Sequence, residues 1–338
     1  MVEHQKPIVA ITMGDPCGIG PEVVAKALSF EEIYALCNPI VVGSAWCMEQ
    51  AVKLVRSPLR VRRQDFTTKL GIDANTIDVI DPINLNPDDV TPGQISPTCG
   101  RAAMEWVSLA AKMAIASQVD AIATAPINKE AASLAGFKAI GHMELLQELS
   151  GSPTVATMLM SGRLRVVHLT THKPLSQAVE YVTKERILSF LELTHHTFAK
   201  WGMPRASIGV AALNPHASDG GVLGHEEASE IIPAVKMAQK KGINATGPIP
   251  ADIVFHQAIR GSYDVVLAMY HDQGHIPIKV YGFDKSITAN LGLPFVRTSV
   301  DHGTAFDIAG KGVATHSSML EAINLAVCLS TGNGLPQT

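Results

Sequence analysis

The chain has 338 residues, 46% hydrophobic and 17% charged, which is enough apolar material for one large core or two smaller ones. Its 27 basic residues nearly balance 31 acidic ones without long runs of one sign, which disfavours nucleic acid and membrane surfaces and favours a small-molecule partner. Five cysteines without CxxC spacing, no apolar run of about 18 residues and no signal-peptide pattern predict a cytoplasmic protein with neither a disulfide framework nor a zinc–thiolate site.

Short apolar, β-branched segments recur and predict strands that alternate with helices. The strands are expected within residues 7–12, 39–43, 120–126, 165–171, 207–215 and 264–270. Helices are expected at 21–36, 98–118, 184–200, 225–241 and 318–329. Strands that are apolar throughout are typical of a parallel sheet with helices on both faces. We therefore predict an α/β fold, and the chain length favours two lobes.

A glycine-rich segment, MGDPCGIGPEV, follows the first predicted strand and contains Gly14, Gly18 and Gly20. Its spacing is not GxGxxG, so a tight strand-to-helix turn explains it as well as a dinucleotide loop does. Further along, residues 81–97 are rich in proline and asparagine, which predicts a long surface connection before the helix at 98–118.

Histidines follow three of the predicted strands, at His172, His216 and His271. Ligands of parallel sheets bind beyond the carboxyl ends of the strands, so these positions have more functional weight than a histidine elsewhere. One such histidine is more often a structural hydrogen-bonding group. Three in equivalent positions predict a divalent metal centre with coordination positions left open for substrate.

Several other side chains are candidates for binding anions or a cofactor. His142 follows a glycine at a helix start, where it would contact an anion or else serve as a cap or core residue. Lys279 and Arg297 would neutralise a carboxylate or phosphate, or remain solvated surface charges. The loop at 301–312 offers backbone donors and an imidazole for stacking, although a polar surface loop is the alternative.

Taken together, these motifs resemble one family. The strings MGDPCGIGPE, PINKE, GHMELL, TTHKPL, LNPHASDGG, YHDQGH and LGLPFVRTSVDHGTAFDIAGKG occur in this order between residues 13 and 312. They are similar to the PdxA family of 4-hydroxythreonine-4-phosphate dehydrogenases and to relatives that act on 4-phosphothreonate and 4-phosphoerythronate. The string HGTAFDIAGKG also resembles the adenosine-binding loop of isocitrate and isopropylmalate dehydrogenases.

The resemblance implies an isocitrate/isopropylmalate dehydrogenase-like fold with two lobes and an active-site cleft between them. Residues 1–128 and 300–338 would form the nucleotide-binding lobe, and residues 129–299 the lobe for metal, substrate and dimerisation. The expected cofactors are NAD or NADP and a divalent metal such as Zn, Mn, Co or Mg. The implied assembly is a homodimer with a shared active site.

The resemblance also implies roles for individual residues. The metal ligands would be His172, His216 and His271, the last supplied by the opposite subunit. The substrate would contact His142, Met143, Lys279, Thr288 and Arg297, although the family has threonine at the position of Met143 and asparagine at that of Thr288. The cofactor would contact Gly14, Asp301, His302, Gly303 and Asp307.

The implied reaction, in pyridoxine biosynthesis, is oxidation of a phosphorylated hydroxy acid to a β-keto acid, followed by decarboxylation. Asp252 and Asp272 are candidates for orienting the histidines or for proton transfer, and Lys129 is another candidate proton carrier. A structural role in a helix cap or a turn is an equally good explanation for the two aspartates. Three other functions stay open: a dehydrogenase of a cyclic cis-dihydrodiol dicarboxylate of the terephthalate type, a non-catalytic nucleotide- and metal-binding regulator, and a hydrolytic metalloenzyme.

Overall fold

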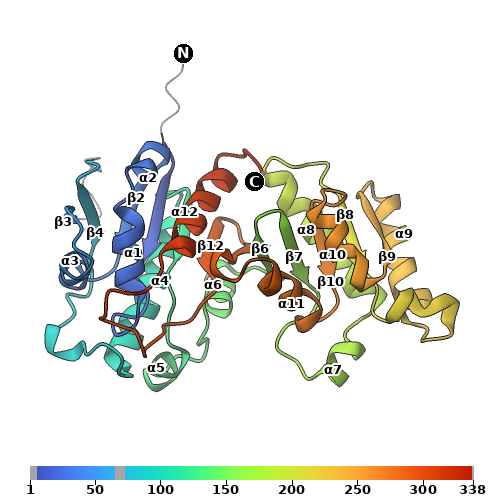
Figure 1. Cartoon of the computed structure of the whole chain (residues 1–338), viewed down its shortest axis with the longest axis horizontal. Coiled ribbons are helices and arrows are strands. Elements are labelled where there is room, and N and C mark those ends of the chain that lie inside the picture. Colours follow the sequence, from blue (N-terminus) through green and yellow to red (C-terminus); the bar gives the residue numbers. More distant parts are fainter. Residues whose placement is uncertain (1–5, 65–72, 337–338) are drawn as a thin grey trace, which may run out of the picture. The chain divides into compact units, whose positions relative to one another are not determined.

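The computed structural model describes residues 6–64 and 73–336, and within them the chain forms two compact units (Figure 1). Unit 1 comprises residues 6–153 and 293–331, and unit 2 comprises 154–292 and 332–336. The expected boundaries near 128 and 300 therefore differ from those observed. The reason is packing: α5 (Lys129–Leu134) and α6 (His142–Ser150) contact α4 (Pro97–Ile115).

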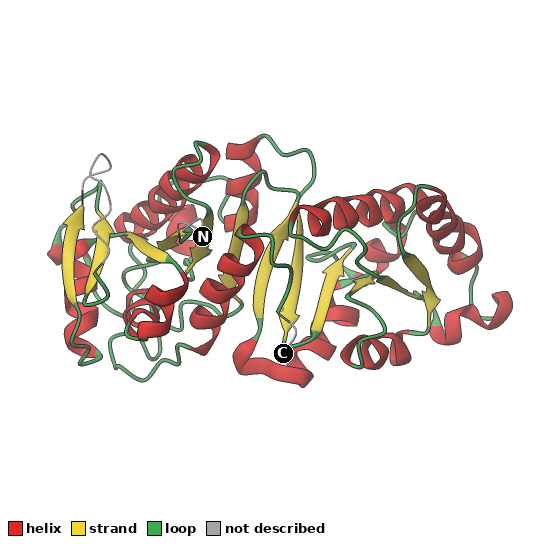
Figure 2. Ribbon diagram, turned by 90° about the horizontal axis from the view of Figure 1, so that it is seen from above, coloured by secondary structure: helices red, strands yellow, loops and turns green. Residues whose placement is uncertain are grey.

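Unit 1 contains a sheet in which every described pair of neighbouring strands is parallel. Helices cover both faces (Figure 2), as expected for strands that are apolar throughout. The strand order is β3 (Arg60–Gln64), β4 (Thr76–Ile80), β2 (Asn38–Val42), β1 (Ile8–Thr12), β5 (Ala121–Thr124) and β12 (Val296–Val300). The other helices of this unit are α1 (Gly20–Leu28), α2 (Glu31–Leu36), α3 (Ala45–Leu54) and α12 (Ser317–Ser330).

The single helix predicted at 21–36 is wrong, because two helices occupy this range. The hydroxyl of Ser29 donates to the carbonyl oxygen of Ala25 at 2.8 Å, and Phe30 is extended at φ −91°, ψ 117°. A side chain that bonds to the preceding turn competes with continued helix. The connection at 81–97 is long as expected, with a single 3-10 turn, η1 (Pro87–Asp89).

Unit 2 has a mixed sheet of six strands. Four neighbouring strands are parallel to one another, and the first strand of a hairpin is antiparallel to both of its neighbours. The strand order is β11 (Ile287–Leu291), β6 (Ala156–Ser161), β7 (Leu164–His168), β10 (Val265–Ala268), β8 (Ile208–Ala211) and β9 (Ala245–Ile249). Only two residues join β6 to β7, and Gly162 adopts a left-handed φ of +50° there. A turn this short forces the antiparallel direction.

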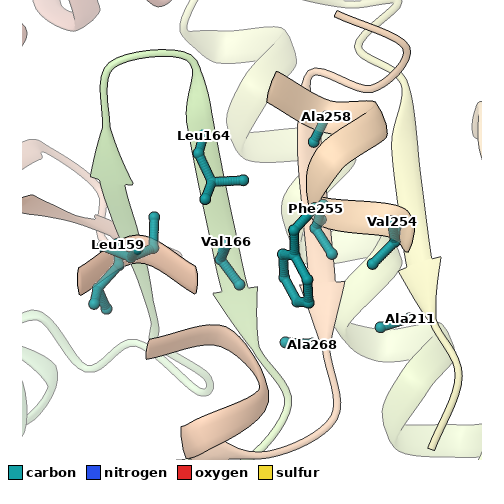
Figure 3. Packing of buried hydrophobic residues seen from close by; sticks show 10 residues of the cluster. Leu159, Leu164, Val166, Ala211, Val254, Phe255, Ala258 and Ala268 are labelled. Atoms are coloured by element: carbon teal, nitrogen blue, oxygen red, sulfur yellow. The ribbon is translucent and has the colours of Figure 1, made fainter. Parts of the chain in front are cut away.

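The helical segments of unit 2 are α7 (Leu175–Glu180), α8 (Lys184–Lys200), α9 (Ile232–Lys240), α10 (Ala251–Ile259) and α11 (His271–Gly282), with shorter turns η2 (Pro215–Gly221), η3 (Glu227–Ile231) and η4 (Phe283–Lys285). Figure 3 shows part of the core, where Phe255 of α10 packs among aliphatic side chains such as Leu164 and Val166 of β7. Among the described residues, none of the helices is both long and apolar enough to cross a bilayer.

Candidate functional site

The carboxyl ends of β7 and β10 place two of the predicted metal ligands together in unit 2. These strands are neighbours, and the ring centroids of His172 and His271 lie 6.0 Å apart. A cavity of about 510 Å³ is lined by both histidines together with Thr171, Lys173, Pro174, Leu175, Ala178, Tyr270 and Asp272. The strand-end pattern therefore brings His172 and His271 to one cavity, as parallel strands require.

His271 is the first residue of α11, and two neighbours orient it. Its Nδ1 lies 2.6 Å from Oδ1 of Asp272, and its ring stacks on that of His275 at 3.6 Å with an interplanar angle of 12°. The Nδ1 of His275 also lies 3.1 Å from the backbone oxygen of His271. Sequence reasoning missed His275, although its i, i+4 spacing from His271 on a helix was a visible signal.

Behind His275 lies His168, whose ring centroid is 4.5 Å away. His168 is 3% exposed and is therefore a core residue. Gly274 makes this packing possible, because a Cβ there would collide with Nε2 of His168. Glycine at this position lets α11 approach β7 closely.

His216 lies in η2 after β8, in an unusual backbone conformation. Four consecutive non-glycine residues, His216 to Asp219, have φ between 44° and 67°. Each such residue costs roughly 1–2 kcal/mol relative to the right-handed conformation, and strain of this kind gathers at functional sites. The Nδ1 of His216 lies 3.1 Å from Oδ2 of Asp219, and the side chain is 69% exposed.

A single protomer does not assemble all three histidines into a metal site. Within residues 6–64 and 73–336, no group of three or more His, Cys, Asp or Glu side chains is placed to hold one ion. The donor chemistry nevertheless fits a metal. His216 and His271 each have Nδ1 beside a carboxylate, and this arrangement leaves Nε2 of each imidazole for a metal ion.

Of the predicted catalytic residues, Asp272 lies beside His271, Asp252 lies on another helix of unit 2, and Lys129 belongs to unit 1. Asp252 is exposed in the first turn of α10, and no hydrogen bond joins it to His172, His216 or His271 in the described structure. Lys129 is the exposed first residue of α5, in unit 1. The geometry therefore supports an orienting role for Asp272.

Unit 1 contains a buried arginine that is held in place by a residue from a distant part of the chain. Arg297 on β12 is only 5% exposed, and its Nη2 donates to Oγ1 of Thr124 on β5 at 2.6 Å. Burial lowers the pKa of Arg297 to about 9, which still leaves the guanidinium charged at neutral pH. A buried charge of this kind is a strong anion-binding group.

His142, the first residue of α6, lies close enough to Arg297 for the guanidinium charge to act on its ring. Its Nε2 is buried and has no hydrogen-bond partner among the described residues. Burial holds the pKa of His142 well below its usual range, and the positive charges of Arg297 and Lys129 lower it further. The imidazole is therefore neutral at pH 7 and offers one ring N–H to a bound anion.

The remaining predicted substrate residues are placed as follows. Met143 follows His142 on α6 and is half-buried. In unit 2, the Nζ of Lys279 lies 3.1 Å from Oγ of Ser286 and 4.9 Å from the ring centroid of Phe283. Thr288 is buried on β11, opposite Leu159 of β6.

The predicted cofactor loop follows β12 in unit 1 and packs on the glycine-rich segment. The N–H of Ile19 donates to the carbonyl oxygen of Thr304 at 3.0 Å, and a Cβ on Gly18 would lie only 2.9 Å from Thr304. Gly14 has φ +76°, and a Cβ there would collide with the carbonyl oxygen of Pro126. These contacts explain the glycines as residues that allow close backbone approach.

Of the predicted cofactor residues in this loop, Asp301 and Gly303 begin it, and His302 is half-buried with its Nδ1 3.0 Å from the carbonyl oxygen of Gly303. Asp307 is exposed, and its carbonyl oxygen accepts from Nζ of Lys311. The loop thus presents polar groups at its surface.

Glu22 tethers the end of this loop to α1. The buried carboxylate accepts from the N–H groups of Gly312 and Ala314 at 3.2 and 2.8 Å, and from Nζ of Lys26 at 2.8 Å. We expect Glu22→Ala to cost about 3–5 kcal/mol because it leaves buried donors unpaired. Chemical denaturation measures this loss. Glu49→Ala, which removes an exposed carboxylate of α3, is the control and should change stability by less than about 0.5 kcal/mol.

Asp15 gives this region a specific pH dependence. Burial raises its pKa from 3.8 to about 6, although its Oδ1 accepts from the N–H of Cys17. The folded state therefore binds this proton more tightly than the unfolded state, so the free energy of unfolding falls as pH rises from about 4 to about 6 and stays lower above that.

Asp15→Asn retains the acceptor for Cys17 and removes the charge. We expect it to be more stable than the wild type at pH 7 by about 1–3 kcal/mol and nearly equal at pH 4. Urea denaturation at both pH values measures the difference, and the exposed Asp88→Asn should show none. A stability gain that is the same at pH 4 and pH 7 would contradict the assignment to the Asp15 charge.

Both units match solved dehydrogenase structures over nearly their whole length. A 4-hydroxythreonine-4-phosphate dehydrogenase from Burkholderia phymatum is 44% identical, has a TM-score of 0.86, and covers 96% of this chain and 99% of its own. A terephthalate 1,2-cis-dihydrodiol dehydrogenase from Burkholderia xenovorans LB400 is 29% identical with a TM-score of 0.68, covering 96% and 98%. The predicted α/β class is confirmed, and the protein is an oxidoreductase of the dehydrogenase class, acting on a CH–OH group.

The family is equally clear. The family model described as pyridoxal phosphate biosynthetic protein PdxA matches residues 35–326. The D-threonate 4-phosphate dehydrogenase of Cupriavidus necator is 44% identical over 326 residues, which are 96% of this chain and 98% of that protein. This chain belongs to the PdxA family, as its motifs predicted.

Proposed function

We propose that this protein oxidises the secondary alcohol of a small hydroxy acid phosphorylated on carbon 4, with D-threonate 4-phosphate as the favoured substrate and NAD or NADP as oxidant. The observation that carries this proposal is the buried, charged Arg297 beside the neutral His142 in unit 1. The relative from Cupriavidus necator bears the name of that activity. The related substrates 4-hydroxythreonine-4-phosphate and 4-phosphoerythronate are the nearest alternatives.

We propose that Arg297 and His142 form an anion pocket, which suits a phosphate because it combines one full charge with a neutral donor. The guanidinium, held in place by Thr124, presents its fork of N–H groups to two phosphate oxygens. The ring N–H of His142 donates to a third. Binding energy from this remote group positions the alcohol for reaction and lowers the barrier through orientation.

The histidines would hold a divalent metal, which when bound stabilises negative charge on the substrate oxygen as a Lewis acid. His172 and His271 of one protomer lie close enough to act together. Carboxylate oxygens of Asp272 and Asp219 lie beside Nδ1 of His271 and His216, and in the tautomer with hydrogen on Nδ1 they would accept its hydrogen bond and leave Nε2 for the metal. We propose that the third ligand is the partner subunit's His216, in place of the partner-supplied His271 that the resemblance implied.

The nicotinamide cofactor would be bound by the loop with Asp301, His302, Gly303 and Asp307, and Gly14 keeps the neighbouring backbone close enough to contact it. When bound there, such a cofactor would supply the acceptor for the hydride of the substrate carbon. Lys129, exposed beside the anion pocket, is the proposed carrier for the hydroxyl proton. Oxidation yields a β-keto acid, and loss of CO₂ completes the reaction. Lys279 and Thr288 of unit 2 would contact the substrate's polar groups.

An apolar surface on α11 and η4 supports the proposal of a homodimer. Ile276, Val280, Tyr281 and Phe283 are all exposed, Val280 to 82% and Phe283 to 67%. Contiguous exposed apolar side chains of this size mark protein interaction sites. His271 begins the same helix, so dimerisation through α11 would bring the partner to the metal site. We place the dimer in the cytoplasm, in keeping with five reduced cysteines.

A cyclic cis-dihydrodiol dicarboxylate is the second candidate substrate, because Met143 supplies an apolar surface where the family pattern has a hydroxyl. The dihydrodiol dehydrogenase relative is, however, 29% identical against 44% for the phosphate-specific ones. The phosphorylated acid is therefore preferred.

Reduction of NAD and NADP with a substrate panel tests the proposal. The panel contains D-threonate 4-phosphate, 4-hydroxythreonine-4-phosphate, 4-phosphoerythronate, unphosphorylated threonate and a dihydrodiol dicarboxylate, each with and without added divalent metal. We expect metal-dependent turnover of a phosphorylated acid, with released CO₂ equal to the nucleotide reduced. Turnover of the dihydrodiol alone would reassign the anion pocket to a carboxylate, and inactivity throughout would support a non-catalytic protein.

A further inference from the structure

Two buried thiols lie in contact beneath the proposed cofactor loop of unit 1. The Sγ atoms of Cys17 and Cys99 are 3.5 Å apart, and both side chains are fully buried. Cys17 belongs to the glycine-rich segment, and Cys99 is the third residue of α4. Neither thiol takes part in the proposed catalysis. Their separation in sequence, 82 residues, means that the fold itself creates the pair.

The two sulfurs are not equivalent. The thiol of Cys17 donates to the sulfur of Cys99, and this hydrogen bond together with one from Ser96 lowers the pKa of Cys99 although burial opposes the shift. The same hydrogen bond and burial raise the pKa of Cys17. Cys99 also occupies the first turn of α4, where backbone N–H groups favour a thiolate. The S–H of Cys99 donates to the carbonyl oxygen of Asp89 at 3.3 Å and is the proton lost when the thiolate forms. Of the two sulfurs, Cys99 is thus the nucleophile and Cys17 the neighbouring thiol able to resolve an oxidised form.

A cavity in unit 1 borders the chain on both sides of Cys17, although neither sulfur of the pair lines it. This cavity of about 290 Å³ is lined by Pro16 and Gly18, the residues on either side of Cys17, and by Cys47. Burial raises the pKa of Cys47 to about 12, so this third thiol stays protonated and reacts slowly. The cavity therefore admits a peroxide-sized molecule to the residues that flank Cys17, and its lining offers no competing thiolate.

We infer that Cys17 and Cys99 form a redox modification site at which hydrogen peroxide produces an intrachain disulfide. The Cys99 thiolate attacks one peroxide oxygen, the O–O bond breaks, and a sulfenic acid forms while hydroxide leaves and takes up a proton as water. The Cys17 sulfur then attacks the sulfenic sulfur, the S–O bond breaks, and the thiol proton leaves with the second water. Two thiols lose two electrons in total, which reduce one peroxide to two waters.

The disulfide would act on the cofactor loop through the backbone of the glycine-rich segment. The carbonyl oxygen of Cys17 accepts from the N–H of Gly93 at 2.8 Å, and Ile19, two residues on, holds Thr304 of the loop. A shift of about 1 Å at bound groups costs up to about 100-fold in rate. This consequence rests on the proposed function, whereas disulfide formation does not.

Graded hydrogen peroxide on the purified, reduced protein tests the site. Remaining thiols are alkylated with iodoacetamide, and the peptides are mapped by mass spectrometry without reduction. We expect two of the five thiols to disappear together, a linked peptide pair containing Cys17 and Cys99, and full reversal by dithiothreitol. Oxidation confined to other cysteines, or irreversible sulfonate at Cys99 without the linked pair, would overturn the proposal.

Three variants assign the roles. Cys17→Ser should leave a Cys99 sulfenic acid that dimedone traps, and Cys99→Ser should give neither the disulfide nor a dimedone adduct at Cys17. Cys37→Ser, which removes another buried thiol of unit 1, should form the disulfide as the wild type does. A dimedone adduct at Cys17 in Cys99→Ser would reverse the assigned order.

The rate of turnover tests whether the disulfide affects activity, separately from whether the disulfide forms. Peroxide should lower the wild-type rate on the order of tenfold or more, reversibly, and leave Cys99→Ser unaffected. If the disulfide forms with unchanged turnover, the coupling to the loop is wrong while the site stands. If no substrate is turned over by the reduced protein, the proposed function fails independently.

Discussion

Replacing His271 by alanine is expected to lower kcat on the order of 10³-fold or more and to abolish tight binding of a divalent ion. The loss is large because this side chain would be a direct metal ligand, and removal of partners that merely orient such ligands already costs about 10–100-fold. Asp272→Asn, which changes only the group beside Nδ1, is therefore expected to fall in that smaller range. Chelation should reproduce the effect of His271→Ala in the wild type, and added metal should reverse it.

Steady-state rates combined with metal content per protomer provide the measurement. His196→Ala is the matched control because it removes an exposed histidine of α8, in the same unit but away from the cavity. It should retain wild-type activity and metal. Full activity of metal-free wild-type enzyme would refute the metal site, and loss of activity in His271→Ala with unchanged metal content would move this residue from metal binding to another role.

Mixing inactive variants decides which protomer supplies each ligand. With His172 and His271 acting from one protomer and the partner subunit's His216 completing the set, His216→Ala mixed with His271→Ala should form hybrid dimers with one intact site. His172→Ala mixed with His271→Ala should give no rescue, since neither hybrid site has both ligands. Rescue in both mixtures, with proven subunit exchange, would mean that the partner contributes His271 instead.

Arg297→Ala is expected to reduce kcat/KM for a phosphorylated substrate by roughly 30- to 5000-fold, corresponding to the 2–5 kcal/mol lost when one member of a buried charged pair is removed. The reduction should lie mainly in KM if the phosphate is bound equally in the ground state and the transition state. Arg297→Lys retains the charge but not the guanidinium fork held by Thr124, so an intermediate loss is expected.

The unphosphorylated analogue separates phosphate recognition from general damage. If Arg297 binds the phosphate, Arg297→Ala and the wild type should differ little in kcat/KM for threonate, because this substrate has no phosphate for Arg297 to bind. Arg163→Ala, which removes an exposed arginine of the β6–β7 turn, is the control and should behave as wild type on both substrates. Equal losses on phosphorylated and unphosphorylated substrates would assign Arg297 to structure.

Local patterns were sufficient for much of the framework. The apolar runs at 7–12 and 264–270 are the strands β1 and β10, because an uninterrupted apolar segment can be buried only in a sheet covered on both faces. His172 and His271 were identified for the same reason: a residue just after a parallel strand lies at the edge where ligands bind, whatever the rest of the fold. The family motifs added the chemistry of the reaction.

Other features depend on contacts between distant residues, which no local pattern contains. Parallel pairing of β5 with β12 places Thr124 beside Arg297, 173 residues away, and so creates the fixed charge of the anion pocket. The contact between Cys17 and Cys99, 82 residues apart, arises in the same way.

The sequence by itself thus determined the α/β class, the family and the histidines at the strand ends, because these follow from periodicity and from residue type at element boundaries. Tertiary structure alone decided the unit boundaries, the stacking of His275 on His271 and the left-handed run after His216. It also decided which buried charges and thiols meet. These features depend on which surfaces pack together, and packing is settled by the whole chain and not by any one segment.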